Sequence, residues 1–385
     1  MKQGSNPFTL WRALKRKLRG EMRVLLTASS VASLVILLRL TGLLQGWELA
    51  AFDQWVRLRP LEPVDDRIIL VGIDEADLRK IGKWPIPDAA LAQLLQRLQA
   101  HQPRAIGIDL YRDMPVEPGH TTLLEQYVAS NLVAIEQIKD KTSPAVPPPS
   151  ALNRQHQVGF NNVPFDPDGK VRRGLLYWKV EGKTHQSFSL SLALMYLKAE
   201  GVTPQKATDG SEHLQLGNAI FRRFAGDDGS YIRADAGGYQ FLANLRGPTN
   251  RFAMVSMTDV LEGRVAAEKF RDRIVLIGST AVSLKDFFPT SYNDDLLGTY
   301  PQQPMAGVEL QANLISQLLS AALEGRSAIG VWSEPMEWFW IWGWSCVGAQ
   351  LGWRLHSANK SALAILLSGI GLAGISYLLF LQGSW

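Results

Sequence analysis

The chain has 385 residues, of which 46 % are apolar, 20 % are charged and one is a cysteine. This composition excludes an intrinsically disordered protein, a disulfide scaffold and a CxxC metal site. The net charge is +4 and the first 23 residues carry a local charge of +6, so the remainder is slightly acidic. Because no basic surface of the kind that binds nucleic acid is predicted, we expect no nucleic-acid partner.

The basic tail over residues 1–23 is followed by an apolar stretch that is long enough to cross a bilayer. Residues 24–44 contain one charge, Arg39, which lies close enough to the end to reach the interface. A cleaved signal peptide is the alternative interpretation. However, the region before the stretch is long, and no convincing small-residue cleavage site follows it. We therefore predict a first transmembrane helix over 24–44.

Two more apolar stretches, at 336–353 and 361–382, are separated by a basic turn over 354–360. The positive-inside rule places the N-terminal tail and this turn in the cytoplasm. The region 45–335 then lies on the outer, periplasmic side of a bacterial plasma membrane, and the chain ends outside without an output domain. Five tryptophans between 332 and 344 fit an aromatic belt at the outer interface, with packing on a neighbouring helix as the alternative.

Strand and helix patterns alternate within 45–335 and predict an α/β domain. Predicted strands cover 67–74, 105–109, 132–138, 159–163, 171–180, 241–245 and 273–277, with a hairpin over 214–224 centred on Gly217-Asn218. One predicted helix has Asp88 as its N-cap. Further helices are predicted over 121–130, 188–199, 258–262 and 308–323. The prolines within 144–149 predict an extended surface loop.

Several strands are continuous apolar runs, which is typical of strands buried on both faces, and right-handed crossovers would make them parallel. We therefore predict a three-layer, Rossmann-like α/β domain with a mostly parallel sheet. It would be inserted between one N-terminal and two C-terminal transmembrane helices.

Eight sequence segments within 45–335, taken in order along the chain, also resemble those of a known family. They are FDQWVRLRP at 52–60, RIILVGIDEADLRKIGKWPIP at 67–87, IGIDLYRD at 106–113, VGFNN at 158–162, DPDGKVRR at 166–173, SFSLSLAL at 187–194, RDRIVLIGSTAVSLKDFFPT at 271–290 and PMAGVELQANLISQLL at 304–319. Together they resemble the CHASE type 2 (CHASE2) family of extracytoplasmic sensory domains, over nearly the whole region.

The resemblance implies a bacterial receptor module, commonly coupled through three C-terminal membrane helices to a cytoplasmic cyclase or kinase. Here two such helices are predicted, and Pro85-Ile86-Pro87 departs from the family's Trp-Pro-Trp-like run. We expect a membrane-anchored sensor that binds an unknown small molecule or protein and relays the signal through its helices. The alternative is a non-signalling or split-receptor module that pairs with a separate cyclase or kinase effector, or forms a homodimer.

Polar residues that follow the predicted strands are the candidates for ligand binding, because ligands of open α/β sheets bind beyond the carboxyl ends of the strands. They are Asp74, Glu75, Asp109, Asn161, Asn244, Ser279, Thr280, Lys285 and Asp286. For Asp74 and Asp109, helix capping or loop anchoring is the alternative. For Gly278-Ser279-Thr280, a tight turn is the alternative to an anion-binding cradle.

No motif predicts catalysis, a metal site or a cofactor. Asp166-x-Asp168-Gly169 lacks the rest of a calcium loop and indicates a turn, and the six histidines never pair at helical spacing. We therefore expect no enzyme activity, with an outer-face hydrolase built on Ser279 as the remote alternative. Trp55 and Trp84 are expected in the core, with an aromatic pocket as the alternative.

Overall fold

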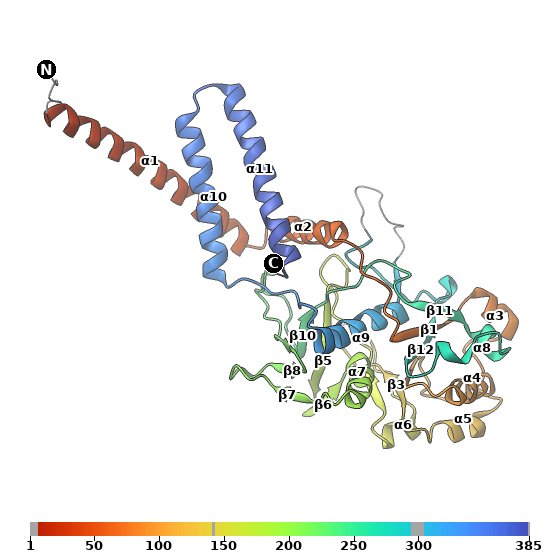
Figure 1. Cartoon of the computed structure of the whole chain (residues 1–385). Helices are drawn as coiled ribbons and strands as arrows, with labels where there is room; N and C mark the ends of the chain where they lie inside the picture. The colour runs from red at the N-terminus through yellow and green to blue at the C-terminus, as the bar shows by residue number, and fades with distance from the viewer. Residues whose placement is uncertain (1–6, 141–142, 294–303, 384–385) are drawn as a thin grey trace. The chain divides into compact units, whose positions relative to one another are not determined.

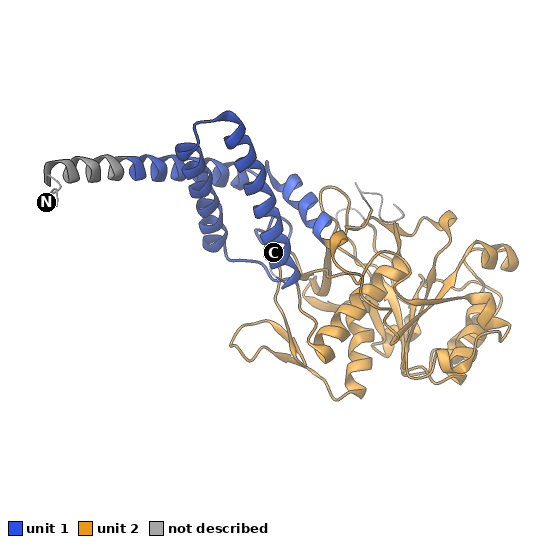
Figure 2. Cartoon of the chain, turned by 45° about the horizontal axis from the view of Figure 1, so that its top comes forward, with its two compact units in different colours: residues 1–55, 225–235, 329–385 blue, residues 56–224, 236–328 orange. Residues whose placement is uncertain are grey.

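The computed structural model describes residues 7–140, 143–293 and 304–383, with side chains from residue 20 onward. The chain divides into two compact units (Figure 2). The helical unit consists of residues 1–55, 225–235 and 329–385, and the α/β unit consists of residues 56–224 and 236–328.

The α/β unit is built on a six-stranded sheet in which every pairing is parallel (Figure 1). Its strand order is β11-β1-β12-β2-β3-β4. The strands are β1 (Ile68–Ile73), β2 (Ala105–Asp109), β3 (Leu132–Glu136), β4 (Val158–Phe160), β11 (Ala253–Ser256) and β12 (Ile274–Ser279). The mostly parallel sheet is thus confirmed. The late strand β12 lies between β1 and β2, whereas β11 is a strand that the sequence analysis missed.

Helices contact both faces of this sheet. Ile69, Val71 and Ile73 of β1 belong to one core cluster with α4, α5 and α8, whereas Ile68 and Leu70 alternate to the opposite face. On that opposite face, α7 and α9 contact the sheet and each other. The helices are α4 (Asp88–Ala100), α5 (His120–Gln126), α7 (Phe188–Ala199), α8 (Met257–Leu261) and α9 (Gly307–Glu324). Burial on both faces explains why β1 is a continuous apolar run.

The predicted N-cap at Asp88 is wrong. Asp88 is the first residue of α4, Pro87 is the cap, and the Asp88 carboxylate instead accepts hydrogen bonds from the loop that follows β2. Two short helices, α3 (Glu75–Ile81) and α6 (Ser150–Arg154), were not predicted. Both contain fewer than two full turns, too few to produce a periodic apolar stripe.

Smaller antiparallel sheets complete the α/β unit. One has the order β10-β5-β6, a second β7-β8-β9, and the third pairs β13 with β14. The strands are β5 (Arg173–Val180), β6 (Lys183–Gln186), β7 (Pro204–Lys206), β8 (Leu214–Leu216), β9 (Ala219–Phe221), β10 (Tyr239–Leu242), β13 (Phe287–Phe288) and β14 (Met305–Ala306). The predicted hairpin is confirmed, because β8 and β9 pair on either side of Gly217-Asn218 and Gly217 has a positive φ of 52°.

The helical unit contains α1 (Pro7–Leu40), the first eleven residues of α2 (Gln45–Leu58), α10 (Glu334–Arg354) and α11 (Ala358–Leu381). In the part of α1 whose side chains are described, from Gly20 onward, the buried ones are Val24, Ala28 and Ala32, which recur every four residues. The main contact of α1 is α10. The Trp342 ring nitrogen donates to the Ser29 hydroxyl at 3.3 Å. Small side chains on one helix face allow such close packing.

Two described helices are long and apolar enough to cross a membrane, at Gly20–Leu40 and Ala358–Leu381. They coincide with the first and third predicted spans. The helical part of the first ends at Leu40, where a turn over 41–44 replaces the last predicted residues. Judged by the same criterion of length and mean hydropathy, α10 is not apolar enough to cross a membrane, because its glutamates, glycines and tryptophans lower its mean hydropathy. A span over 336–353 therefore stays a prediction.

Candidate functional site

Two carboxylates and an amide meet beyond the carboxyl ends of the parallel strands. Asp109 is the last residue of β2 and is 8 % exposed, and Asn161 follows β4 directly. Asp286 lies in the loop between β12 and α9. These three sequence candidates come from different strand ends and lie on one edge of the sheet, as their positions predict.

Two glycines make room for the carboxylates. A side chain at Gly278 would lie 3.4 Å from the Asp109 Cβ and 2.6 Å from the Val308 Cβ, so Asp109 lies beside the first turn of α9. A Cβ at Gly307 would lie 2.7 and 2.8 Å from the two Asp286 carboxylate oxygens. Asp286 therefore lies against the first residue of α9, Gly307, whose backbone N–H donates to the Asp286 carbonyl oxygen at 3.0 Å.

The environment of this pair favours the protonated carboxyl. Burial and the negative charge of Asp286 together raise the pKa of Asp109 to about 8. Burial also raises the pKa of Asp286, and it raises the pKa of Glu309 in the first turn of α9. At neutral pH the pair therefore retains a proton, and it presents both a hydrogen-bond donor and an acceptor.

A hydrogen-bonded frame surrounds the pair. The Tyr111 hydroxyl bonds to the Asn161 side-chain oxygen at 3.2 Å and to the Gln137 side chain. The Gln311 side-chain amide donates to the Asn161 backbone oxygen at 3.3 Å, which links β4 to α9. Tyr111 is 39 % exposed, so this corner reaches the surface. Sequence reasoning missed Tyr111, Gln137 and Gln311, although Tyr111 lies two residues beyond Asp109.

Asp74 and Glu75 have structural partners. Asp74 caps α3, where its carboxylate accepts from the backbone N–H groups of Ala76 and Asp77 at 2.8 Å each. Glu75 accepts from the Ser283 backbone N–H at 2.8 Å, and this hydrogen bond lowers its pKa. The capping alternative for Asp74 is therefore the one that these contacts support.

Ser279 is the last residue of β12 and pairs with Ile73, and Thr280 continues this pairing with β1. The Thr280 backbone N–H donates to the Ile73 carbonyl oxygen at 3.0 Å, and its side chain packs over Gly72. The Ser279 hydroxyl is buried and has no hydrogen-bond partner in the described structure. Because side chains alternate along a strand, Ser279 lies with Val275 and Ile277 on the face of the sheet that packs against α4. Asp109 lies on the opposite face, beside α9.

Lys285 and Asn244 are not part of this cluster. Lys285 is exposed and ends a short 3-10 helix, η2 (Val282–Leu284), in a left-handed conformation. Asn244 is buried after β10, and its backbone N–H donates to the Gln317 side chain in α9 at 2.8 Å. Gln317 is ten residues from Gly307, which is about 15 Å along the helix.

The turn at 166–169 binds arginines. Asp166 and Asp168 accept hydrogen bonds from Arg172, and Asp166 also pairs with Arg173. The predicted turn is confirmed, since the Gly169 backbone N–H donates to the Asp166 carbonyl oxygen. Among the residues that the structure describes, no group of three or more His, Cys, Asp or Glu side chains is placed to hold a metal ion.

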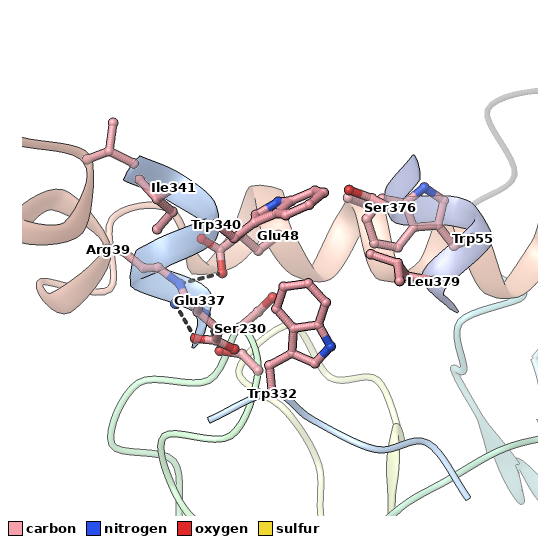
Figure 3. Close-up of a pocket in the computed structure, with 13 residues that line it drawn as sticks. Arg39, Glu48, Trp55, Ser230, Trp332, Glu337, Trp340, Ile341, Ser376 and Leu379 are labelled. Carbon is pink, nitrogen blue, oxygen red and sulfur yellow. Dashed lines mark hydrogen bonds and ion pairs between the residues drawn. The ribbon is translucent and has the colours of Figure 1, made fainter. Parts of the chain in front are cut away.

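The helical unit contains a cavity of about 270 Å³ that sequence reasoning did not predict (Figure 3). Its charged members are Arg39 of α1, Glu48 of α2 and Glu337 of α10. Its aromatic members are Trp55, Trp332 and Trp340. The Arg39 charge inside an otherwise apolar stretch, followed by Glu48, was the available signal, but sequence analysis assigned Arg39 to the membrane interface.

The expectation that Trp55 and Trp84 are core residues is not met. Trp84 is 42 % exposed in the α/β unit. Trp55 belongs to the helical unit, where it lines the cavity and packs against Phe380 with ring centroids 6.1 Å apart. Nearness to a strand pattern in the sequence did not predict burial, because neither Trp55 nor Trp84 lies in a strand.

Comparison with known proteins decides the family. The sequence model of the CHASE2 domain family matches residues 30–350, which is most of the chain. This chain belongs to the CHASE2 family. CHASE2 domains are the sensory domains of signalling receptors, which agrees with the resemblance carried by the sequence segments. No curated protein and no solved structure matches the chain. The CHASE2 match includes parts of α1 and α10 as well as the α/β unit.

Proposed function

We propose that this chain is a membrane-anchored receptor that holds its CHASE2 domain on the extracytoplasmic side and relays ligand binding through its membrane helices. The observation that carries this proposal is the position of the two candidate spans. Gly20–Leu40 precedes the α/β unit and Ala358–Leu381 follows it, and the CHASE2 match lies largely between them. Both ends of the sensory domain therefore continue into helices suited to a bilayer.

The distribution of basic residues supports the orientation. Six Lys and Arg residues precede the first candidate span and Arg23 lies near its start, and Arg354 and Lys360 flank the connection between α10 and α11. Cytoplasmic segments next to membrane helices are enriched in such residues. With both segments inside, the α/β unit is outside.

We place the sensory ligand at the carboxyl edge of the sheet, beside Asp109, Asn161 and Asp286. This assignment treats the domain as three-layered and doubly wound, the architecture in which ligands bind at this edge. A buried carboxyl pair with one proton, a Tyr111 hydroxyl and an Asn161 amide suits a small polar molecule with several hydrogen-bond donors. A charge or contact change here would act on α9, because the Asp286 carboxylate lies against its first residue, Gly307.

The contacts of Ser279 do not support catalysis by the α/β unit. The buried Ser279 hydroxyl has no hydrogen-bond partner in the described structure, so it lacks the adjacent base that a serine nucleophile requires. We therefore propose a binding rather than a catalytic role for the domain, with a cyclase or kinase effector, or a second copy of this chain, as the partner.

Cysteine labelling tests the orientation. In a Cys346→Ser background, Asp113→Cys places a thiol on an exposed loop of the α/β unit, and Lys360→Cys places one in the first turn of α11. A membrane-impermeant maleimide should label the first variant in intact spheroplasts and the second only after permeabilisation. The Cys346→Ser parent is the control and should not react. Labelling of Lys360→Cys in intact spheroplasts, with Asp113→Cys protected, would contradict the proposal.

A further inference from the structure

The cavity of the helical unit has walls of aromatic rings. Trp55 comes from α2, Trp332 from the segment before α10, and Trp340 from α10 itself. The rings of Trp332 and Trp340 are nearly perpendicular, with an interplanar angle of 89° and centroids 5.5 Å apart. Figure 3 shows the three indole rings around one space, with Leu379 beside them.

The charges at this cavity do not balance. Arg39 donates from Nε to Glu48 at 3.2 Å and from Nη1 to Glu337 at 2.5 Å. It also donates from Nη2 to the Gly229 carbonyl oxygen at 2.5 Å. One guanidinium thus faces two carboxylates, and the Arg39 and Glu337 side chains are only 14 % and 13 % exposed. The described lining has a formal charge of −1, which favours a cation.

From these observations we propose that the cavity binds an alkylated ammonium group. The faces of tryptophan rings attract cations, and sets of such rings recognise quaternary ammonium groups. An alkylated ammonium offers methyl groups to the rings and requires few hydrogen-bond acceptors, which fits a lining whose polar side chains are already largely paired. The proposal does not depend on the ligand assigned to the sheet edge.

The cavity accommodates a small ligand group. Its volume of about 270 Å³ is enough for a headgroup or a small ion. A trimethylammonium group reaches it from two sources, a free choline-like compound or the headgroup of a choline lipid. Arg39 lies one residue before the end of α1, at the end of a candidate span.

Choline binding to the full chain tests the proposal. The protein is placed in nanodiscs of phosphatidylglycerol, which has no ammonium group, and radiolabelled choline is titrated by equilibrium dialysis. We expect saturable binding that Trp340→Leu weakens at least about tenfold and Trp340→Phe weakens less, because phenylalanine retains a ring face. Trp342→Leu is the matched control on the same helix and should bind as the unmodified chain does.

A neutral analogue of choline distinguishes recognition of the positive charge from simple binding of apolar groups in the cavity. 3,3-Dimethyl-1-butanol has the shape of choline without its charge and should compete at least tenfold more weakly than tetramethylammonium. Nanodiscs of phosphatidylcholine identify the source: competition with choline assigns the site to the lipid headgroup, and unchanged binding assigns it to a soluble compound. Absence of saturable choline binding in phosphatidylglycerol discs, equal competition by the neutral probe, or equal binding by folded Trp340→Leu would overturn the proposal.

Discussion

Two buried aspartates of the α/β unit, Asp65 and Asp109, show how neighbouring groups shift the pKa of an aspartate in opposite directions. Asp65 is 4 % exposed, and burial alone would raise its pKa. Hydrogen bonds from Arg67 at 2.7 Å and Ser316 at 2.6 Å, with the charges of Arg67 and Arg246, outweigh burial and lower that pKa. Asp109 has the opposite shift, because burial raises its pKa and its charged neighbour is another carboxylate, which raises it further. Asp65 is therefore an anchor, whereas Asp109 stays a candidate for ligand binding.

The raised pKa of Asp109 predicts the pH dependence of stability. A carboxyl whose folded-state pKa is about 8 binds more protons in the folded than in the unfolded chain between about pH 4 and 8. The free energy of unfolding should therefore fall as pH rises through this range. Asp109→Asn removes the ionising group, so its curve should fall less. At pH 8 it should be the more stable by on the order of a few kcal/mol.

Urea unfolding in detergent, followed by far-UV circular dichroism from pH 5 to 9, measures this difference. Asp113→Asn changes an exposed aspartate in the loop that follows β2 and should give the same profile as the unmodified chain. A flat profile for the unmodified chain, or an Asp109→Asn variant that is less stable at pH 8, would contradict the interpretation.

At the element scale, strand β4 depends on a glycine where α7 begins. A Cβ at Gly159 would lie 2.5 Å from both the backbone nitrogen and the Cα of Phe188. Ser187 is the N-cap of α7, and its hydroxyl accepts from the Leu190 backbone N–H. The close approach thus places the start of α7 directly on β4, next to the Asn161 corner of the sheet edge. Sequence patterns predicted both elements but not their contact.

Gly159→Ala should therefore destabilise the α/β unit. The clash is with backbone, which cannot move aside without displacing α7, so we expect a loss of roughly 1–3 kcal/mol in the free energy of unfolding. Gly46→Ala is the control, because nothing lies within 4 Å of a Cβ there and alanine favours its helix. Urea unfolding of both variants is the measurement. Equal stability of Gly159→Ala and the unmodified chain would show that the contact is looser than described.

At the scale of the whole molecule, the chain passes repeatedly between its two units. Residues 225–235 belong to the helical unit, yet β9 before them and β10 after them belong to the α/β unit. Gly229 in this segment accepts a hydrogen bond from Arg39, so the insertion contributes to the lining of the cavity. The polypeptide therefore connects the α/β unit to the helical unit at this internal segment as well as at its ends.

The division predicts that the α/β unit folds by itself. A chain of residues 56–328, with a short Gly-Ser linker in place of 225–235, retains the complete parallel sheet and its core cluster. We expect a soluble protein with mixed α/β circular dichroism and one cooperative transition, with a stability of about 5–15 kcal/mol. A non-cooperative aggregate, under conditions where the full chain unfolds cooperatively in detergent, would show that the helical unit is required for folding.

The sequence by itself determined the elements and the family. The buried strands at β1, β2 and β12, the helix α7 and the hairpin at Gly217-Asn218 follow from local apolar periodicity and turn chemistry, which depend on neighbouring residues alone. The sequence segments that resemble the CHASE2 family predicted a sensory domain without the structure. The strand-end rule also brought Asp109, Asn161 and Asp286 together, because a parallel sheet places its carboxyl ends on one edge.

Only the tertiary structure decided what depends on contacts between distant residues. It placed β12 between β1 and β2, removed Asn244 from the sheet edge, and put Ser279 on the face opposite Asp109. It also joined Arg39, Glu48 and Glu337 across three helices. Such pairings are set by packing and charge between segments up to about 300 residues apart, and no local pattern in the sequence records them.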